Sequence, residues 1–226
     1  MKKTLILLSF IGCVLIALPG QSQGISFSYI IPKNGYLSAP ISPFSIRGVG
    51  FGGKYVRIET GFSLYTFPEL PMTGLPFSSQ KSLSGPSLGL LIPAEAALSI
   101  PIGKGKLKFL GGGFLMSQFW QKLNLGNLDR ALSQMEGWDV ANATAQLKSK
   151  PGVGWMTGVE IDIPVNRTYS FSFSIQYLHG STPSPISGTY TGGTINGPLL
   201  TLPLDGTQAR TLLEGLEISV GVSMRH

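Results

Sequence analysis

The sequence predicts an all-β fold, an eight-stranded antiparallel up-and-down transmembrane β-barrel with long extracellular loops and a short helical insert. Three observations predict it. Segments with one apolar and one polar face recur along the chain, and short and long connections alternate between them. Charged residues are only 12% of the chain, whereas hydrophobic residues are 42% and glycines number 30. Such a composition suits a barrel whose outer wall faces lipid.

The clearest predicted strand covers residues 168–179. Its apolar side chains fall at every second position and alternate with serines and a glutamine; they are Tyr169, Phe171, Phe173, Ile175 and Tyr177. Successive side chains on a strand point to opposite faces, so this segment has one apolar and one polar face. Aromatic residues at both ends of the apolar face are typical of a strand that crosses a bilayer.

Seven further segments show the same alternation. They are residues 24–31, 44–51, 54–67, 87–100, 106–121, 152–163 and 211–225. Pro93 and the run Gly111-Gly112-Gly113 interrupt two of them. Because proline lacks a backbone donor and glycine has no side chain to pack, we expect a bulge at Pro93 and a bulge or a sharp bend at the glycines.

The connections between these segments alternate in length. The short ones are Gly52-Gly53, residues 101–105 and residues 164–167. An open sheet edge is not tolerated in lipid, so an even number of strands that close into a barrel is expected. Short turns then lie on the periplasmic side and long loops lie outside.

Two of the long connections have internal structure of their own. In residues 122–151, Leu128, Leu132 and Met135 recur at helical spacing, and Asn127 is expected to cap the helix. We expect this helix to pack on a loop, with a place on the membrane surface or in the lumen as alternatives. In residues 181–210 we expect a hairpin around Gly192-Gly193.

The first 22 residues are predicted to be a secretory signal peptide, and residues 23–226 an outer-membrane barrel domain. Lys2 and Lys3 precede an apolar run that ends near Leu18, and small residues follow it. An uncleaved anchor and a lipoprotein signal at Cys13 are the alternatives. Cys13 is the only cysteine, so a cleaved chain would hold no disulfide.

This arrangement of strands and loops resembles the small eight-stranded outer-membrane β-barrel proteins of Gram-negative bacteria. The resemblance implies a bacterial outer-membrane location, outer-membrane lipid as surroundings, and a structural or surface-binding role through the long loops, which would contact a partner in the envelope. The net charge is +6, and no run of basic residues with interleaved aromatics appears, so nucleic acid is not an expected partner.

The polar faces of the predicted strands place charges of both signs inside the barrel. They are Arg47, Arg57, Glu59, Glu95, Lys106, Lys108, Glu160, Asp162 and Glu217. A buried charge without a partner is very costly, so we expect a paired network that plugs the lumen. A narrow ion path or a site for a small polar molecule is the alternative.

The trio His179-Gly180-Ser181 is similar to the His-x-Ser of outer-membrane lipid A deacylases, where a histidine activates a nearby serine at the outer rim of the barrel. On a strand the two side chains share a face. That family also has an acidic partner soon after and an Asn beside the serine, whereas here Thr182 follows and the next acidic residue is Asp205. A histidine of the interfacial girdle is the competing interpretation.

No cofactor or metal site is expected, because the chain has two histidines and one of them is its last residue. The leading interpretation is a small outer-membrane barrel with a structural or surface-binding role rather than an enzyme. A lipid A deacylase-like hydrolase is one alternative, and a secreted, soluble lipocalin-like carrier is another. The carrier is disfavoured because apolar faces outnumber polar ones on nearly every strand.

Overall fold

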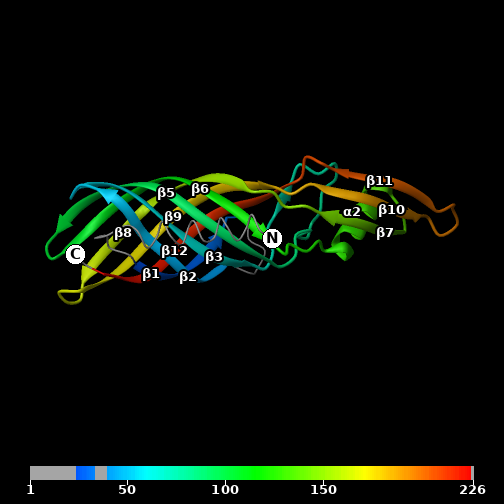
Figure 1. Ribbon diagram of the computed structural model, residues 1–226. Coiled ribbons are helices and arrows are strands. Elements are labelled where there is room, and N and C mark those ends of the chain that lie inside the picture. The colour runs from blue at the N-terminus through cyan, green and yellow to red at the C-terminus, as the bar shows by residue number, and fades with distance from the viewer. Residues whose placement is uncertain (1–23, 34–39, 225–226) are drawn as a thin grey trace, which may run out of the picture.

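The computed structural model describes residues 24–33 and 40–224, and the strands within them form a closed barrel (Figure 1). Eight antiparallel strands of this part of the chain follow one another around it: β1 (Gly24–Pro32), β2 (Ile41–Gly52), β3 (Val56–Phe67), β5 (Ser87–Ile102), β6 (Gly105–Phe119), β8 (Gly152–Pro164), β9 (Tyr169–Pro183) and β12 (Arg210–Met224). Pairing of β1 with β12 closes the ring. The predicted fold class is confirmed; the predicted signal peptide, residues 1–22, lies outside the described residues.

The outer wall of the barrel is apolar, and the inward face of β1 and β9 carries mostly small polar side chains. On β1, Phe27 is 49% exposed whereas its neighbour Ser28 is fully buried. The same alternation continues on β9, where Phe171 and Phe173 point outward and Ser174 is buried. A face of this kind, repeated around a closed barrel, is suited to lipid rather than to water.

No register shift, and therefore no bulge, occurs at Pro93 or at Gly111–Gly113, although the pairing of β3 with β5 is interrupted beside Pro93. β5 and β6 pair in an unbroken register through both places, and Pro93 stands opposite Phe114. A Cβ atom at Gly112 would lie 2.1 Å from the carbonyl oxygen of Ala94, so this glycine permits a close approach of two strands. The register shifts lie instead where β2 pairs with β1 and with β3.

Three of the long loops build a small domain beyond the extracellular end of the barrel (Figure 1), since Leu83 of residues 74–86 belongs to its core. Its antiparallel sheet has the order β11 (Leu200–Gly206), β10 (Ile186–Gly193), β7 (Val140–Leu147), and α2 (Leu125–Glu136) packs on β7. The predicted hairpin around Gly192-Gly193 corresponds to β10 and β11. A short strand, β4 (Met72–Thr73), pairs with the start of β12.

The helix in residues 122–151 is present, but its predicted cap is wrong. Asn124 is the N-cap, and its side chain accepts a hydrogen bond from the Asn127 amide at 3.3 Å. Asn127 lies inside the helix, where its side chain donates to the Ser82 carbonyl at 2.7 Å. No helix in the described ranges is long and apolar enough to cross a membrane.

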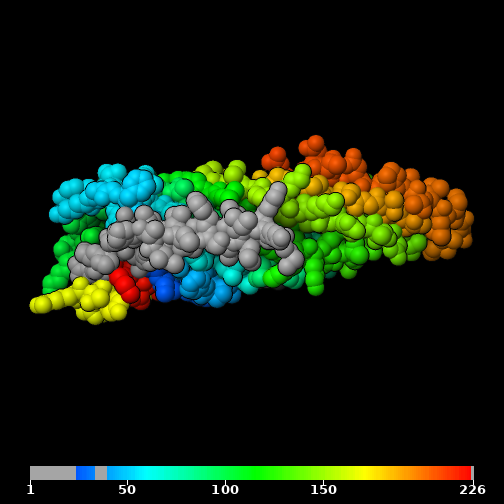
Figure 2. All heavy atoms as spheres, in the orientation of Figure 1, coloured from blue at the N-terminus to red at the C-terminus, as the bar shows by residue number. Residues whose placement is uncertain are grey.

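This extracellular domain has a hydrophobic core of its own. Leu128 and Leu132 of α2 are fully buried against Ile186 and Tyr190 of β10 and Leu204 of β11. The helix therefore lies neither in the lumen nor on the membrane surface. Figure 2 shows the orange residues of the β10–β11 hairpin projecting beyond the barrel.

Polar side chains join the domain to the barrel rim. The Gln121 amide donates to Ser84 Oγ at 2.9 Å and to Thr211 Oγ1 at 3.1 Å. Thr211 Oγ1 in turn donates to Ser184 Oγ at 2.8 Å. Because β9 and β12 continue into β10 and β11 with only a few intervening residues, the domain is an extension of the barrel wall.

Candidate functional site

All nine charged residues predicted for the lumen lie on inward-facing positions of the barrel strands. They extend from the middle of the barrel to its periplasmic end, and most are largely buried. Lys106 is the exception, because it lies at the periplasmic rim and is exposed. The alternation of β2, β3, β5, β6, β8 and β12 explains this placement, since every second side chain points inward.

One ionic cluster surrounds Lys108 of β6. Its ammonium nitrogen lies 2.6 Å from Glu160 Oε1 and 3.0 Å from Asp162 Oδ2, both on β8. Glu59 of β3 lies at 3.9 Å from the same nitrogen and at 3.9 Å from Arg57 Nε. One lysine thus meets three carboxylates, so the network is more acidic at this point than simple pairing predicts.

A second ionic cluster surrounds Glu217 of β12. Arg47 Nη2 donates to Glu217 Oε1 at 2.7 Å, and the Tyr65 hydroxyl donates to the same oxygen. Arg47 Nε also donates to Ser63 Oγ at 3.1 Å. Glu95 is not part of this cluster but accepts a hydrogen bond from a side chain of β9 at 3.2 Å.

The β9 donor to Glu95 is Gln176, and neither it nor Tyr65 was among the predicted lumen residues. Tyr65 continues the inward series of Arg57 and Glu59 at even spacing, so extension of that series along β3 would have found it. Gln176 stands among the inward serines of β9. Both side chains are uncharged, whereas the predicted network contains only charged residues.

The extracellular half of the lumen is filled by apolar side chains, which the sequence analysis did not predict. The buried cluster contains Ile30, Tyr65, Phe67, Leu70, Leu91, Phe114, Met116, Met156, Leu178 and Leu213. The rings of Tyr65 and Phe67 stack with their centroids 5.5 Å apart. These side chains therefore occupy the bore above the ionic clusters, as eight-stranded barrels allow.

A polar group stands on the lipid-facing side at the extracellular rim. His179 Nδ1 of β9 lies 3.6 Å from Glu214 Oε1 of β12, which is its partner in the strand register. The same oxygen accepts hydrogen bonds from Lys33 at 2.6 Å and from Tyr177 at 2.5 Å. The hydrogen bond to Glu214 raises the pKa of Lys33. The ring centroids of Trp155 and His179 lie 5.6 Å apart.

The two residues of the deacylase-like trio occupy the same face of β9, as expected. His179 is exposed, and Ser181 is partly exposed. In the part of the chain that the structure describes, no hydrogen bond joins the Ser181 hydroxyl to His179. No acidic residue follows Ser181 closely in the sequence, whereas the structure brings Glu214 to His179 from the neighbouring strand. Glu214 was detectable as the one acidic position on the apolar face of β12.

The described residues contain no group of three or more His, Cys, Asp or Glu side chains that is placed to hold a metal ion. The chemistry available to the site comes from its buried charge pairs and from the Glu214 carboxylate at the extracellular rim. The closed strands, the filled lumen and the apolar outer wall define the class of small outer-membrane β-barrel proteins.

No protein family matches this chain by sequence, and no curated protein matches it. Among solved structures, the outer membrane protein OprG from Pseudomonas aeruginosa is similar, with a TM-score of 0.50 and 10% sequence identity. The similarity covers 88% of this chain and 95% of that chain. At this identity the likeness concerns the fold, and it agrees with the eight-stranded barrel predicted from the strand pattern.

Proposed function

We propose that this protein is a plugged outer-membrane barrel that holds a rigid binding domain at the cell surface. The observation that carries the proposal is the filling of the lumen by two successive layers. Apolar side chains such as Phe114 and Met116 close the extracellular half, and the pairs around Lys108 and Glu217 fill the periplasmic half. A barrel without a bore does not serve general diffusion, so its work lies at its surface.

The tip of the extracellular domain is the best candidate for the binding surface. Ile195 is 83% exposed, Leu199 68% and Leu200 50%, although water surrounds this part of the molecule. Asp139 holds the turn, since its Oδ2 accepts from the Ile195 amide at 2.8 Å and its own amide donates to the Gly193 carbonyl at 3.1 Å. A fixed, exposed apolar tip marks a contact with another protein.

Quantitative crosslinking in intact cells tests this proposal. We expect Ile195→Asn with Leu199→Asn to reduce the recovery of a defined envelope partner by at least about tenfold, the loss that corresponds to about 1.4 kcal/mol. The control is Leu125→Asn with Met135→Asn, which changes exposed apolar residues on α2 of the same domain. Equal recovery of partners by the tip variant and the control would contradict the proposal.

A lipid hydrolase is the second candidate function, and the proximity of His179 to Glu214 favours it. In this case Glu214 orients His179, which takes the proton of the Ser181 hydroxyl as its oxygen attacks an acyl ester carbon. The ester C–O bond breaks, the leaving alkoxide takes the proton from His179, and water then hydrolyses the acyl-serine.

Mass spectra of lipid A from expressing cells decide this second candidate. Loss of an acyl chain that disappears in Ser181→Ala and in Glu214→Gln, but persists in Ser187→Ala, supports it. Ser187 is an exposed serine of the extracellular domain and serves as the matched control. If lipid A is unchanged in cells that express the wild-type chain, the hydrolase function is rejected and the binding function is the one retained.

A further inference from the structure

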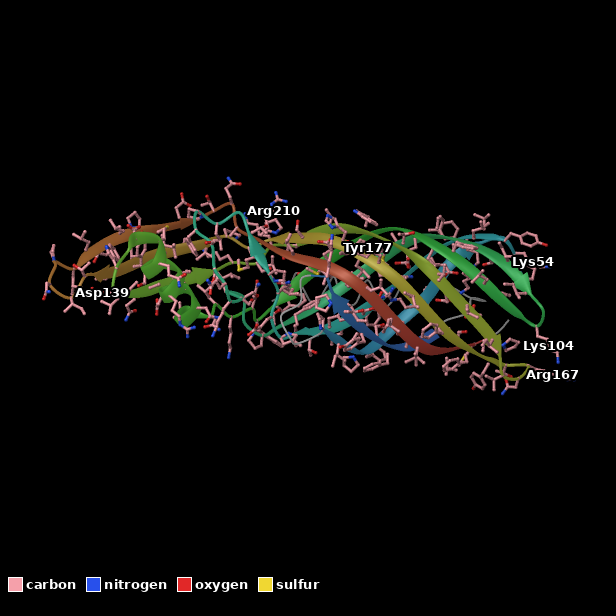
Figure 3. All side chains as sticks on the ribbon, turned by 180° about the vertical axis from the view of Figure 1, so that it is seen from behind. Lys54, Lys104, Asp139, Arg167, Tyr177 and Arg210 are labelled. Carbon is pink, nitrogen blue, oxygen red and sulfur yellow. The ribbon has the colours of Figure 1, made fainter. Side chains whose placement is uncertain are left out.

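The periplasmic mouth of the barrel contains a cavity of about 180 Å³ with strongly basic walls. Five cationic side chains line it, and they come from β3, β6 and two turns: Lys54, Arg57, Lys104, Lys106 and Lys108. Figure 3 shows Lys54, Lys104 and also Arg167 at the end of the barrel opposite Asp139. The cavity opens on the periplasmic side, because turn residues form part of its wall.

Arg57 and Lys108 are balanced by the ionic cluster that also contains Glu59 and Glu160, whereas the three lysines at the rim are not balanced in the described part of the chain. Of the described residues that line it, Asp162 alone carries a carboxylate, and that carboxylate already meets Lys108 at 3.0 Å. Lys54, Lys104 and Lys106 take part in no ion pair within residues 24–33 and 40–224. Low-dielectric walls concentrate the field of such a group of charges at the opening.

We propose that this periplasmic mouth binds a phosphate-type oxyanion. Two features favour it over a single carboxylate. Several cations converge on one small space, and a phosphate group brings more than one negative charge to them. The ionic cluster around Lys108 forms the floor of the cavity, so the anion stops there instead of crossing the barrel.

The phosphate can belong to a free periplasmic compound or to the headgroup of an inner-leaflet phospholipid. Lys104 and Lys106 are the residues to change, because both are exposed and their loss leaves the pairs around Lys108 intact. Lys148→Gln with Lys150→Gln is the matched control. These two lysines have the same spacing and are also exposed, but they lie between β7 and β8 at the extracellular side.

Isothermal titration of the purified full chain in neutral detergent with inorganic pyrophosphate tests the site. We expect saturable binding that weakens about tenfold in Lys104→Gln with Lys106→Gln and is unchanged in the control variant. No binding by the wild-type chain, or the same loss in both double variants, would overturn the proposal. Heat-modifiable migration on gels verifies that each variant retains the barrel.

Nanodiscs distinguish the two sources of phosphate. If a headgroup occupies the mouth, pyrophosphate binds more weakly in phosphatidylglycerol discs than in phosphatidylcholine discs, and the difference disappears in Lys104→Gln with Lys106→Gln. If the ligand is a free compound, the affinity of the wild-type chain is similar in both discs. Binding that is equally weak for the wild type and this variant in every lipid contradicts the site.

Discussion

Arg47 of β2 and Glu217 of β12 meet inside the barrel at 2.7 Å, although 170 residues separate them in the sequence. The Glu217 side chain is only 1% exposed, and Tyr65 donates to the same carboxylate oxygen. The contact exists because β2 and β12 both pair with β1, one on each side of it.

Removal of one member of this pair is expected to destabilise the barrel strongly. Arg47→Met leaves a buried carboxylate with its charge uncompensated, which costs about 3–5 kcal/mol in comparable pairs. Replacement of both partners, Arg47→Met with Glu217→Leu, should recover most of that loss. Denaturant unfolding in micelles, followed by tryptophan fluorescence, measures both effects. Similar midpoints for the single and the double variant would contradict the pairing.

The filled lumen predicts that the purified protein shows no large conductance steps in planar bilayers. Arg57→Ala with Glu59→Ala should remain closed, because the apolar cluster lies above this pair. Steps should appear only when Phe114→Ala and Met116→Ala are added. Large steps from the wild-type chain would show that the bore is open.

The separate core of the extracellular domain predicts that it can be destabilised without loss of the barrel. Leu132 is fully buried, so Leu132→Ala should cost about 2–5 kcal/mol within this domain. We expect rapid protease cleavage in residues 122–151 and 184–209, while heat-modifiable migration of the barrel persists. Met135→Ala is the control, since Met135 is 41% exposed on the same helix. If Leu132→Ala unfolds the extracellular domain and the barrel together, the two form a single cooperative unit.

Tyr190 provides a pH-dependent readout of the same domain. Burial and a hydrogen bond to Glu136 raise the pKa of Tyr190 to about 12. Because its pKa is higher in the folded state than the ordinary value near 10, its contribution to stability is complete below pH 10 and is lost as the pH rises toward 12. Ultraviolet titration at alkaline pH measures this, and Glu136→Gln should lower the pKa. Titration of Tyr190 near pH 10 in the wild type would contradict the burial.

The positions of the barrel strands could be predicted from the sequence because the alternation of apolar and polar residues within each strand is enough to identify it. Lipid on one side and a packed lumen on the other impose the period of two, and a slip of one residue would turn Arg57 and Glu59 toward lipid. The same period placed the nine lumen charges on the inward face. The helix of residues 122–151 was also detectable from its local spacing, whereas its cap was misplaced by three residues.

Side-chain partners were not predictable in this way, because they depend on which strands become neighbours and on how far each is staggered. His179 finds its carboxylate on β12, not in the residues that follow it, since the register places Glu214 opposite. The ring of Phe114 fits in the lumen because Gly154 and Gly180 lie beneath it, and a Cβ atom at Gly154 would lie 2.3 Å from that ring.

The sequence by itself determined which segments cross the membrane, which face of each is apolar and where the long loops lie, because these properties follow from local alternation and composition. The tertiary structure alone decided that the loops combine into a domain, that the outer half of the lumen is apolar and that the periplasmic mouth is basic. Each of these features is made by residues from several strands or loops, and closure of the barrel and its stagger bring them together.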